Sequence, residues 1–292
     1  MVREFLVGMI ACIACVACAD TEFIVIDVSG GVDADNYPVT KLENPPAGGW
    51  GDEYKTSKIV LKRIVGSGED YYIGIFEVTQ GQWELVTGKR PSYYNNDECY
   101  RSRPVEKVSY DDIRGKVKGS EYPKSSGVDD KSFIGLLRKK ANLPTIDIPT
   151  RSQWTFACRG IAENEDTDNS EVIARRARLG VNCGYYLTPP AAFRGCGIDN
   201  GTAKVGSYEP NSFGLYDMHG NVCEWCCDDC DESDETVIRL GCSWGEFRPF
   251  GKFRVLKGGH CESSAPFCKS TIVYGKNSSL SSGATGLRLS CR

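Results

Sequence analysis

Short apolar runs separated by turn-forming residues dominate the chain, and they predict many short strands. Residues 58–65 (KIVLKRIV) and 71–78 (YYIGIFEV) are rich in β-branched and aromatic residues, which favour extended structure. Residues 23–28 form a shorter run of the same kind. Residues 254–259 and 286–292 are further strand candidates, and in the latter the apolar residues alternate as they do on one face of a strand.

Helical signals are few, and each predicts a short helix. Thr79, Ser109 and Thr150 each stand just before a short segment with an apolar face, where a hydroxyl can cap a helix. Gln153 follows Thr150 at the spacing of a capping box, and Gly88 is placed to end the first helix. No long helical pattern follows residue 160. The sequence therefore predicts an α+β fold with few short helices, short antiparallel strands and much irregular loop.

The first 19 residues have the pattern of a secretory signal peptide. Arg3 precedes an apolar run over residues 5–16, and residues 17–19 (ACA) fit a small-residue cleavage site. The run is shorter than the ~20 residues that a membrane-spanning helix needs, so no transmembrane span is expected. We expect a protein that is secreted or in the cell envelope. Lipid attachment at Cys18 is the alternative, in which the mature chain is a lipoprotein.

Composition limits the remaining possibilities. We expect residues 20–57, which are rich in Gly, Pro and Asp after the first strand, to be an N-terminal extension packed on one main domain of residues 58–292. The formal net charge of −4 gives no basic surface for nucleic acid. The chain has only 2 histidines, which is too few for a three-histidine iron site.

Fifteen cysteines give the sequence its most distinctive chemistry. Three lie in the expected signal peptide, and ten of the other twelve follow residue 180, so we expect a disulfide-rich C-terminal half. The stretch GLYDMHGNVCEWCCDDC (214–230) holds four, at 223, 226, 227 and 230. Its C-x-x-C spacings leave three readings open: disulfides, a four-cysteine zinc site, or a redox pair.

Six phrases in a fixed order resemble the formylglycine-generating enzyme, or sulfatase-modifying factor, family. The resemblance covers residues 58–292. The phrases are IGIFEVTQGQWELVTG (73–88), RPVEKVSYDDIRG (103–115), IPTRSQWTFACRG (148–160), KVGSYEPNSFGLYDMHGNVCEW (204–225), RVLKGG (254–259) and GLRL (286–289). The resemblance implies a variant of the C-type lectin-like fold. The family includes copper-dependent oxidases of a cysteine in a protein substrate, iron-dependent sulfoxide synthases and binding proteins, so the site residues must decide the function.

The copper site of the family is incomplete in this chain. The resemblance places two copper-binding cysteines four and nine positions after Gly259, where this chain has Ser263 and Cys268. Because a hydroxyl cannot replace a thiolate for Cu(I), the two-sulfur site is not expected to form. One alternative remains, a displaced copper site of Cys261 and Cys268 aided by His260. The other reading is that both cysteines are in disulfides.

The resemblance also implies a structural calcium ion. The matching ligands are the Asp217 and Glu224 carboxylates and the Gly220 and Val222 carbonyls, a set of hard oxygen donors. A second calcium site would involve Asn182. The alternative is that Asp217 and Glu224 cap backbone amides without an ion.

The favoured function is a non-catalytic binding module, with an unknown protein or small ligand bound by the loops of residues 240–285. Exposed aromatics among Ser, Gly and Asn suit adaptable recognition, although the same aromatics could instead fill a core. The candidate ligand-binding residues are Trp244, Phe247, Arg248, His260, Phe267 and Tyr274. The alternative function is a formylglycine-generating oxidoreductase that uses the displaced copper site.

Overall fold

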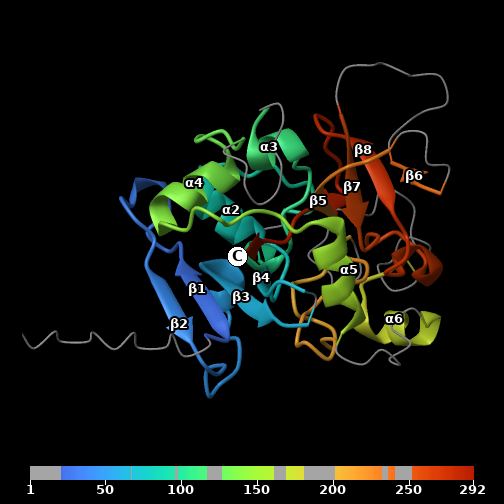
Figure 1. The fold of residues 1–292 in the computed structure, drawn as a ribbon, viewed down its shortest axis with the longest axis horizontal. Coiled ribbons are helices and arrows are strands. Elements are labelled where there is room, and N and C mark those ends of the chain that lie inside the picture. The colour runs from blue at the N-terminus through green and yellow to red at the C-terminus, as the bar shows by residue number, and fades with distance from the viewer. Residues whose placement is uncertain are drawn as a thin grey trace, which may run out of the picture.

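The computed structural model has an α+β architecture with two five-stranded sheets that lie side by side (Figure 1). It describes residues 21–66, 68–95, 98–116, 127–160, 169–180, 201–231, 236–240 and 252–292. The expected signal peptide, Asn182, Trp244, Phe247 and Arg248 lie outside these ranges.

The first sheet has the strand order β10-β4-β3-β1-β2, and every neighbouring pair is antiparallel. Its strands are β1 (Phe23–Asp27), β2 (Val39–Leu42), β3 (Lys58–Ile64), β4 (Tyr71–Gly74) and β10 (Ser290–Cys291). The segment expected as an N-terminal extension supplies β1 and β2, and β1 is hydrogen-bonded along β3. This segment therefore completes a sheet of the main domain.

The second sheet has the order β6-β8-β7-β5-β9 and is formed by the C-terminal half. Its strands are β5 (Cys223–Asp229), β6 (Ile238–Arg239), β7 (Phe253–Lys257), β8 (Tyr274–Asn277) and β9 (Thr285–Gly286). The strands are short and mostly antiparallel, as predicted, but the pairs β5–β9 and β6–β8 are parallel. After β9 the chain returns to the first sheet, so its C-terminus lies between the two sheets (Figure 1).

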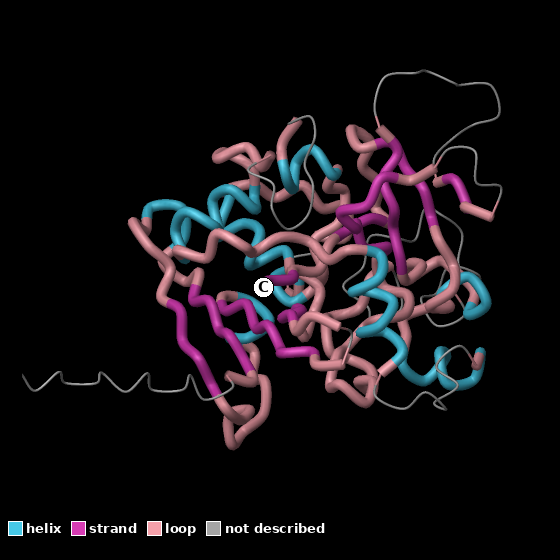
Figure 2. Tube along the Cα trace, viewed as in Figure 1, coloured by secondary structure: helices cyan, strands magenta, loops and turns pink. Residues whose placement is uncertain are grey.

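The helices are short and lie around the sheets (Figure 2). They are α1 (Glu53–Thr56), α2 (Gln80–Thr87), α3 (Tyr110–Arg114), α4 (Phe133–Ala141), α5 (Arg151–Arg159) and α6 (Ser170–Arg176). The side chains of Thr79, Ser109 and Thr150 accept hydrogen bonds from the backbone N–H three residues on, and all three form capping boxes. The three predicted helix starts are confirmed. The helix α4 was not predicted, although Ser132 caps it in the same way, with its side chain accepting from the Gly135 N–H.

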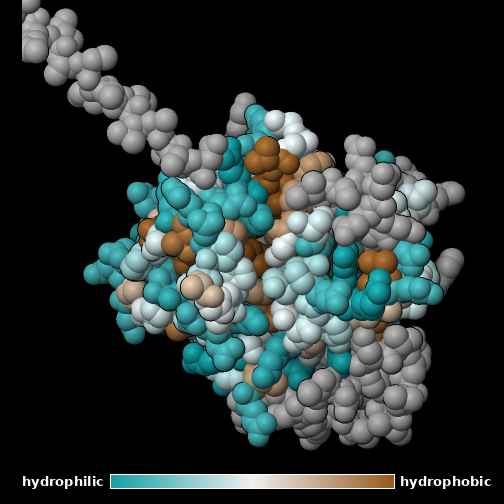
Figure 3. All heavy atoms as spheres, turned by 90° about the horizontal axis from the view of Figure 1, so that it is seen from below, coloured by the Kyte–Doolittle hydropathy of each residue, from teal (hydrophilic) through white to brown (hydrophobic). Residues whose placement is uncertain are grey.

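Aromatic and aliphatic side chains fill the space between the sheets and helices. The largest apolar cluster joins the first sheet to α2 and α4, where the Trp83 and Phe133 rings stack at 4.7 Å. Hydrophilic residues cover most of the described surface in the view of Figure 3, with small apolar patches between them. None of the helices in the described ranges combines the length and hydrophobicity needed to cross a bilayer.

The predicted disulfides are not confirmed. The described ranges hold nine cysteines, and no disulfide joins any of them. The strand β5 gives a physical reason for three of these cysteines. Successive side chains of a strand point to opposite faces, so Cys223 and Cys227 pack in the largest apolar cluster while Cys226 packs in a second one. The C-x-x-C spacing at 223 and 226 therefore separates its thiols across the sheet, where they share neither a bond nor a metal.

Candidate functional site

A buried polar cluster, here called the Arg288 cluster, joins both sheets. It consists of Glu77, Asp217, Glu224 and Arg288, and all four side chains are at most 2% exposed. Arg288 Nη2 donates to Glu224 Oε1 at 2.8 Å, and Arg288 Nε lies 3.0 and 3.1 Å from the two Glu224 oxygens. The Trp154 indole donates to Glu224 Oε2 at 2.6 Å. Glu224, predicted as a calcium ligand, is thus also the main counter-ion of Arg288.

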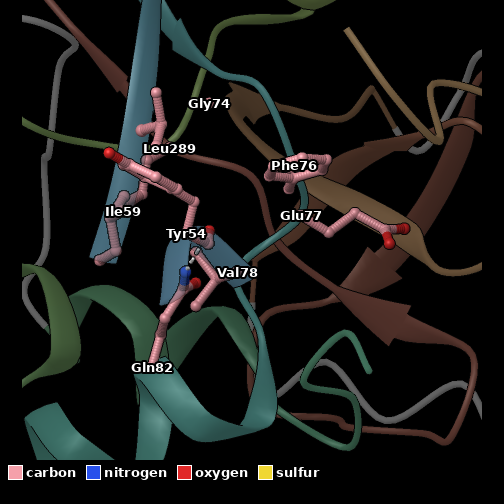
Figure 4. Close-up of a pocket in the computed structure, with 9 residues that line it drawn as sticks. Tyr54, Ile59, Gly74, Phe76, Glu77, Val78, Gln82 and Leu289 are labelled. Carbon is pink, nitrogen blue, oxygen red and sulfur yellow. Dashed lines mark hydrogen bonds between the residues drawn. The ribbon is translucent and has the colours of Figure 1, made fainter. Parts of the chain in front are cut away.

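Glu77 ties this cluster to the loop that precedes β5. Its oxygens accept hydrogen bonds from the Val222 backbone N–H (3.1 Å) and the Asn221 side chain (2.6 Å). Figure 4 shows Glu77 pointing away from a small cavity that Tyr54 and Gln82 help to line. That cavity, of about 10 Å³, has room for a single water at most and is not a substrate site.

Negative charge exceeds positive charge in the Arg288 cluster, because three carboxylates face one guanidinium. Burial first, and then the charges of Asp217 and Glu224, raise the pKa of Glu77 well above its ordinary value. Burial also raises the pKa of Asp217 to about 6. One Asp217 oxygen accepts from the Gly206 N–H at 2.6 Å, whereas the other is buried without a hydrogen-bond partner. A buried, unpartnered carboxylate oxygen in an acidic surrounding fits a bound cation.

Three of the predicted calcium ligands lie in a tightly turned loop, and the fourth, Glu224, lies at the start of β5. Asp217 and Gly220 both have left-handed backbone conformations, with φ of 57° and 73°. In the described residues no group of three or more His, Cys, Asp or Glu side chains is arranged to hold a metal ion. The predicted set does not have that form, since two of its four donors are the Gly220 and Val222 carbonyls. Sequence reasoning missed Glu77 and Arg288, although both lie inside the phrases that carry the family resemblance.

The environment of Cys268 explains why its thiol stays neutral. Cys268 ends a 3-10 helix, η4 (Ala265–Cys268), and is fully buried. Burial raises its pKa to about 12, against the opposing effect of hydrogen bonds from the Gly220 backbone and the Ser263 hydroxyl. A side chain at Gly259 would collide with the Cys268 sulfur, and Gly259 has φ +74°. Ser263, which stands at the position of the other copper cysteine, is close enough to Cys268 for its hydroxyl to lower the pKa of that thiol.

Cys261 has different surroundings. Its backbone N–H donates to the Asn221 carbonyl at 2.9 Å, and its side chain helps to line a cavity that also contains Tyr94 and Glu262. Cys268 packs instead in an apolar cluster with Ile173, Ala177 and Leu179. The structure thus places the two cysteines of the displaced copper hypothesis in two distinct environments.

The cavity beside Cys261, here called the Tyr94 cavity, has a volume of about 310 Å³. Its walls come from residues 93–94, 107, 260–262 and 282–284. The Tyr94 hydroxyl donates to Glu262 Oε1 at 3.2 Å, and the Tyr93 and Tyr94 rings meet edge to face at 5.2 Å. Tyr93 is 60% exposed, so aromatic surface is open at the rim.

His260 is the predicted ligand-binding residue that lines this cavity. Burial and the charge of Lys276 lower the pKa of His260 to about 4, so its ring is neutral near pH 7. Phe267 is 50% exposed, as a surface anchor would be. Tyr274 is only 3% exposed and donates its hydroxyl to the Phe267 carbonyl at 2.7 Å, which makes it a core residue. The adjacent tyrosines of residues 93–94 were missed, although paired aromatics in a Pro- and Asn-containing turn are a sequence signal.

Comparison with known proteins identifies the family of the chain. Residues 62–292 match the model of the sulfatase-modifying factor enzyme 1-like domain. Over 202 residues the chain is 30% identical to a "Chaperone protein LppX" of Paenibacillus barcinonensis, covering 60% of this chain and 68% of that protein. It is 31% identical over 125 residues to a formylglycine-generating enzyme of Thermomonospora curvata, covering 41% of this chain and 40% of that enzyme.

Among solved structures, Treponema denticola variable protein 1 has a similar fold. The TM-score is 0.54 at 22% identity, and the match covers 80% of this chain and 95% of that one. At this identity the likeness concerns the fold alone. The family assignment rests on the domain model, which spans most of the chain and contains the Arg288 cluster and the loop of Ser263 and Cys268. The chain therefore belongs to the sulfatase-modifying factor enzyme 1-like domain family.

Proposed function

We propose that this chain is an exported, non-catalytic member of its family that binds a ligand in the Tyr94 cavity. The observation that carries the proposal is the side-by-side position of Ser263 and Cys268. Copper enzymes of the family need two thiolates there, and a hydroxyl is a poor ligand for Cu(I). The remaining thiol is buried, and burial raises its pKa to about 12, so it must lose a proton at high cost before it could bind metal.

A peptide assay tests the absence of catalysis. Purified protein with Cu(I) and oxygen is incubated with a cysteine-containing sulfatase peptide, and mass spectrometry follows conversion of cysteine to aldehyde. We expect no conversion by the wild type. Ser263→Cys is the informative variant, because it restores the second thiol beside Cys268. Conversion by the wild type that is lost in Cys261→Ser and in Cys268→Ser would instead support the displaced copper site.

We also propose a structural calcium ion held by Asp217, the Gly220 and Val222 carbonyls, and Glu224. The support is the buried, unpartnered Asp217 oxygen and the excess of carboxylates over guanidinium around it. When bound, calcium would supply the missing positive charge and fix the loop before β5. The proposed role is structural, so no chemical step depends on the ion.

Thermal unfolding with and without a chelator tests the calcium site. Asp217→Asn is the better variant, because Asn tolerates the left-handed backbone at this position and keeps one side-chain oxygen. Glu224→Gln is unsuitable alone, because it also breaks the ion pair with Arg288. We expect chelation to lower the Tm of the wild type and to have a smaller effect on Asp217→Asn. An unchanged wild-type Tm would contradict the site.

Export itself is tested by the N-terminus of the mature protein. Mass spectrometry of the protein recovered from its native host should find a chain beginning at Asp20. A chain beginning at a lipid-modified Cys18 would support the lipoprotein alternative. An intact Met1 would contradict export through this segment.

A further inference from the structure

Glu106 is a buried carboxylate next to the Tyr94 cavity, and one of its oxygens has no hydrogen-bond donor among the described residues. Its side chain is 0% exposed. One oxygen accepts from the Tyr94 backbone N–H at 2.8 Å, while Oε2 is buried without a hydrogen-bond partner. A buried oxygen left without a donor is costly, and such groups require an explanation. A hydrogen-bond donor on a bound ligand would explain this oxygen.

Gly283 opens the cavity toward this oxygen. A side chain added at Gly283 would point between three groups: Glu106 Oε2 at 3.5 Å, the Tyr94 ring at 3.7 Å and the Tyr93 Cβ at 3.9 Å. Gly283 and both tyrosines line the cavity, and Glu106 Oε2 lies next to Gly283, although Glu106 is not itself part of the lining. The backbone at Gly283 has no positive φ, so glycine is not required there for conformation. Glycine matters at this position because it leaves a space that any side chain would fill.

The charges around this space are mixed: Glu106 and Glu262 are carboxylates, while Arg103 and Lys107 are cations close enough to lower the pKa of Glu106. Glu262 adds a second carboxylate, which the Tyr94 hydroxyl orients. His260 contributes no charge near pH 7, since burial lowers its pKa to about 4. Lys107 is exposed to solvent at the outer wall, and the buried Lys276 donates to the Ser282 hydroxyl at 2.8 Å. Tyrosine rings beside carboxylates are the usual surroundings of bound ammonium groups.

We propose that the Tyr94 cavity binds a protonated amine, which donates to Glu106 Oε2 above Gly283 and is flanked by Glu262 and the Tyr94 ring. The proposal rests on the proposed ligand-binding function and names the chemical class of the ligand. The amine can belong to a free small molecule or to a lysine side chain of a protein partner. The outer wall, where Lys107 lies, suits a neutral or anionic remainder of the ligand.

An NMR titration of the full mature chain tests this, with the tyrosine ring signals as the readout. The probes are butylammonium, a blocked pentapeptide Gly-Gly-Lys-Gly-Gly, and the same peptide with acetylated lysine. We expect the lysine peptide to shift the signals of Tyr93 and Tyr94 and the acetylated peptide to bind at least about tenfold more weakly. Binding of butylammonium as well would show that the amine alone suffices. Binding of the lysine peptide alone would identify a protein side chain as the source.

Two variants separate the proposed contact from general damage to the fold. Glu106→Gln removes the charge, and Gly283→Val fills the opening without altering any carboxylate. We expect each to weaken binding of the lysine peptide about tenfold or more. Glu43→Gln changes a carboxylate in an exposed position after β2 and should bind as the wild type does.

The proposal is overturned if both peptides bind equally, if Gly283→Val binds like the wild type, or if no amine binds at concentrations up to about 10 mM. If the acetylated peptide or a glutamate-containing peptide shifts the same tyrosine signals while amines do not, the cavity is a ligand site for another class. In that case the amine inference fails and the proposed binding function stands. Aldehyde formation by the wild type would instead overturn the proposed function.

Discussion

Two groups of buried carboxylates in this protein differ in how their charge is balanced. In the Arg288 cluster, Glu224 meets a guanidinium at 2.8 Å and Glu77 accepts two hydrogen bonds from the loop before β5. At the Tyr94 cavity, Glu106 has one oxygen without a donor next to a space of about 310 Å³. The first group is closed by residues from both sheets, except at Asp217, where one oxygen lacks a donor and the proposed calcium ion would bind. The second is left open, which is what a ligand site requires.

The largest loss of stability is expected from removing the guanidinium of Arg288. Arg288→Met leaves three buried carboxylates without their cation and removes hydrogen bonds to the Gly74 and Ile75 carbonyls. We expect a loss of about 3 to 5 kcal/mol in the free energy of unfolding, measured by urea denaturation. Arg292→Met is the matched control, because its partner Glu69 is exposed and the pair is worth under about 1 kcal/mol. Equal losses in the two variants would contradict the description of the Arg288 cluster.

A smaller effect on stability, which depends on pH, is expected from Glu106 at the Tyr94 cavity. Burial raises the pKa of Glu106 from 4.5 to about 7, while hydrogen bonds from the Tyr94 and Tyr93 backbone and the charges of Lys107 and Arg103 oppose the shift. Between these values the folded chain holds the proton more tightly than the unfolded chain does. The contribution of Glu106 is therefore fully present at low pH and is lost as pH rises through about 7, a change of about 1 to 3 kcal/mol.

Urea denaturation of the wild type and Glu106→Gln at several pH values measures this contribution. The stability difference between the two proteins should change between pH 5 and pH 8, in the direction that disfavours the wild type at the higher pH. A difference that is constant across this range would contradict an open, desolvated Glu106. The lysine peptide should restore part of the wild-type stability at the higher pH, because it binds the ionised carboxylate.

The smallest effect on stability is expected at the rim of the cavity. Tyr93 is 60% exposed, so Tyr93→Ser should change the free energy of unfolding by less than about 0.5 kcal/mol. Trp154→Phe is the comparison in the closed group, because it removes the indole N–H that donates to Glu224 at 2.6 Å and should cost about 1 to 3 kcal/mol. A loss in Tyr93→Ser as large as in Trp154→Phe would show that the rim also stabilises the fold.

Local features were predicted well from the sequence, and long-range ones were not. A capping box joins residues three apart, so Thr79, Ser109 and Thr150 could be assigned from their own neighbours. The pair of Glu224 and Arg288 joins residues 64 apart, and a single sequence does not encode such a pairing visibly. The resemblance to the family identified the loop of Ser263 and Cys268 as a candidate site. The burial and charge of the residues in the Arg288 cluster and at the Tyr94 cavity could be determined only from the structure.

The cysteines show why spacing alone misled the prediction. C-x-x-C at residues 223–226 suggested a knuckle or a disulfide, since either needs the two thiols on one side of the chain. The segment is a strand, so Cys223 and Cys226 pack on opposite faces in separate apolar clusters. Residues 223–227 are all buried, so no alternation of exposed and buried positions marked this strand in the sequence.

Cu(I) titration tests the central claim most directly. Wild type, Cys268→Ser and Ser263→Cys are titrated anaerobically in the presence of a competing Cu(I) chelator. We expect the wild type and Cys268→Ser to bind copper equally weakly, because Ser263 offers Cys268 a hydroxyl in place of a second thiol. Ser263→Cys should gain one tightly bound equivalent. Tight binding of one equivalent by the wild type that is lost in Cys268→Ser would contradict the account.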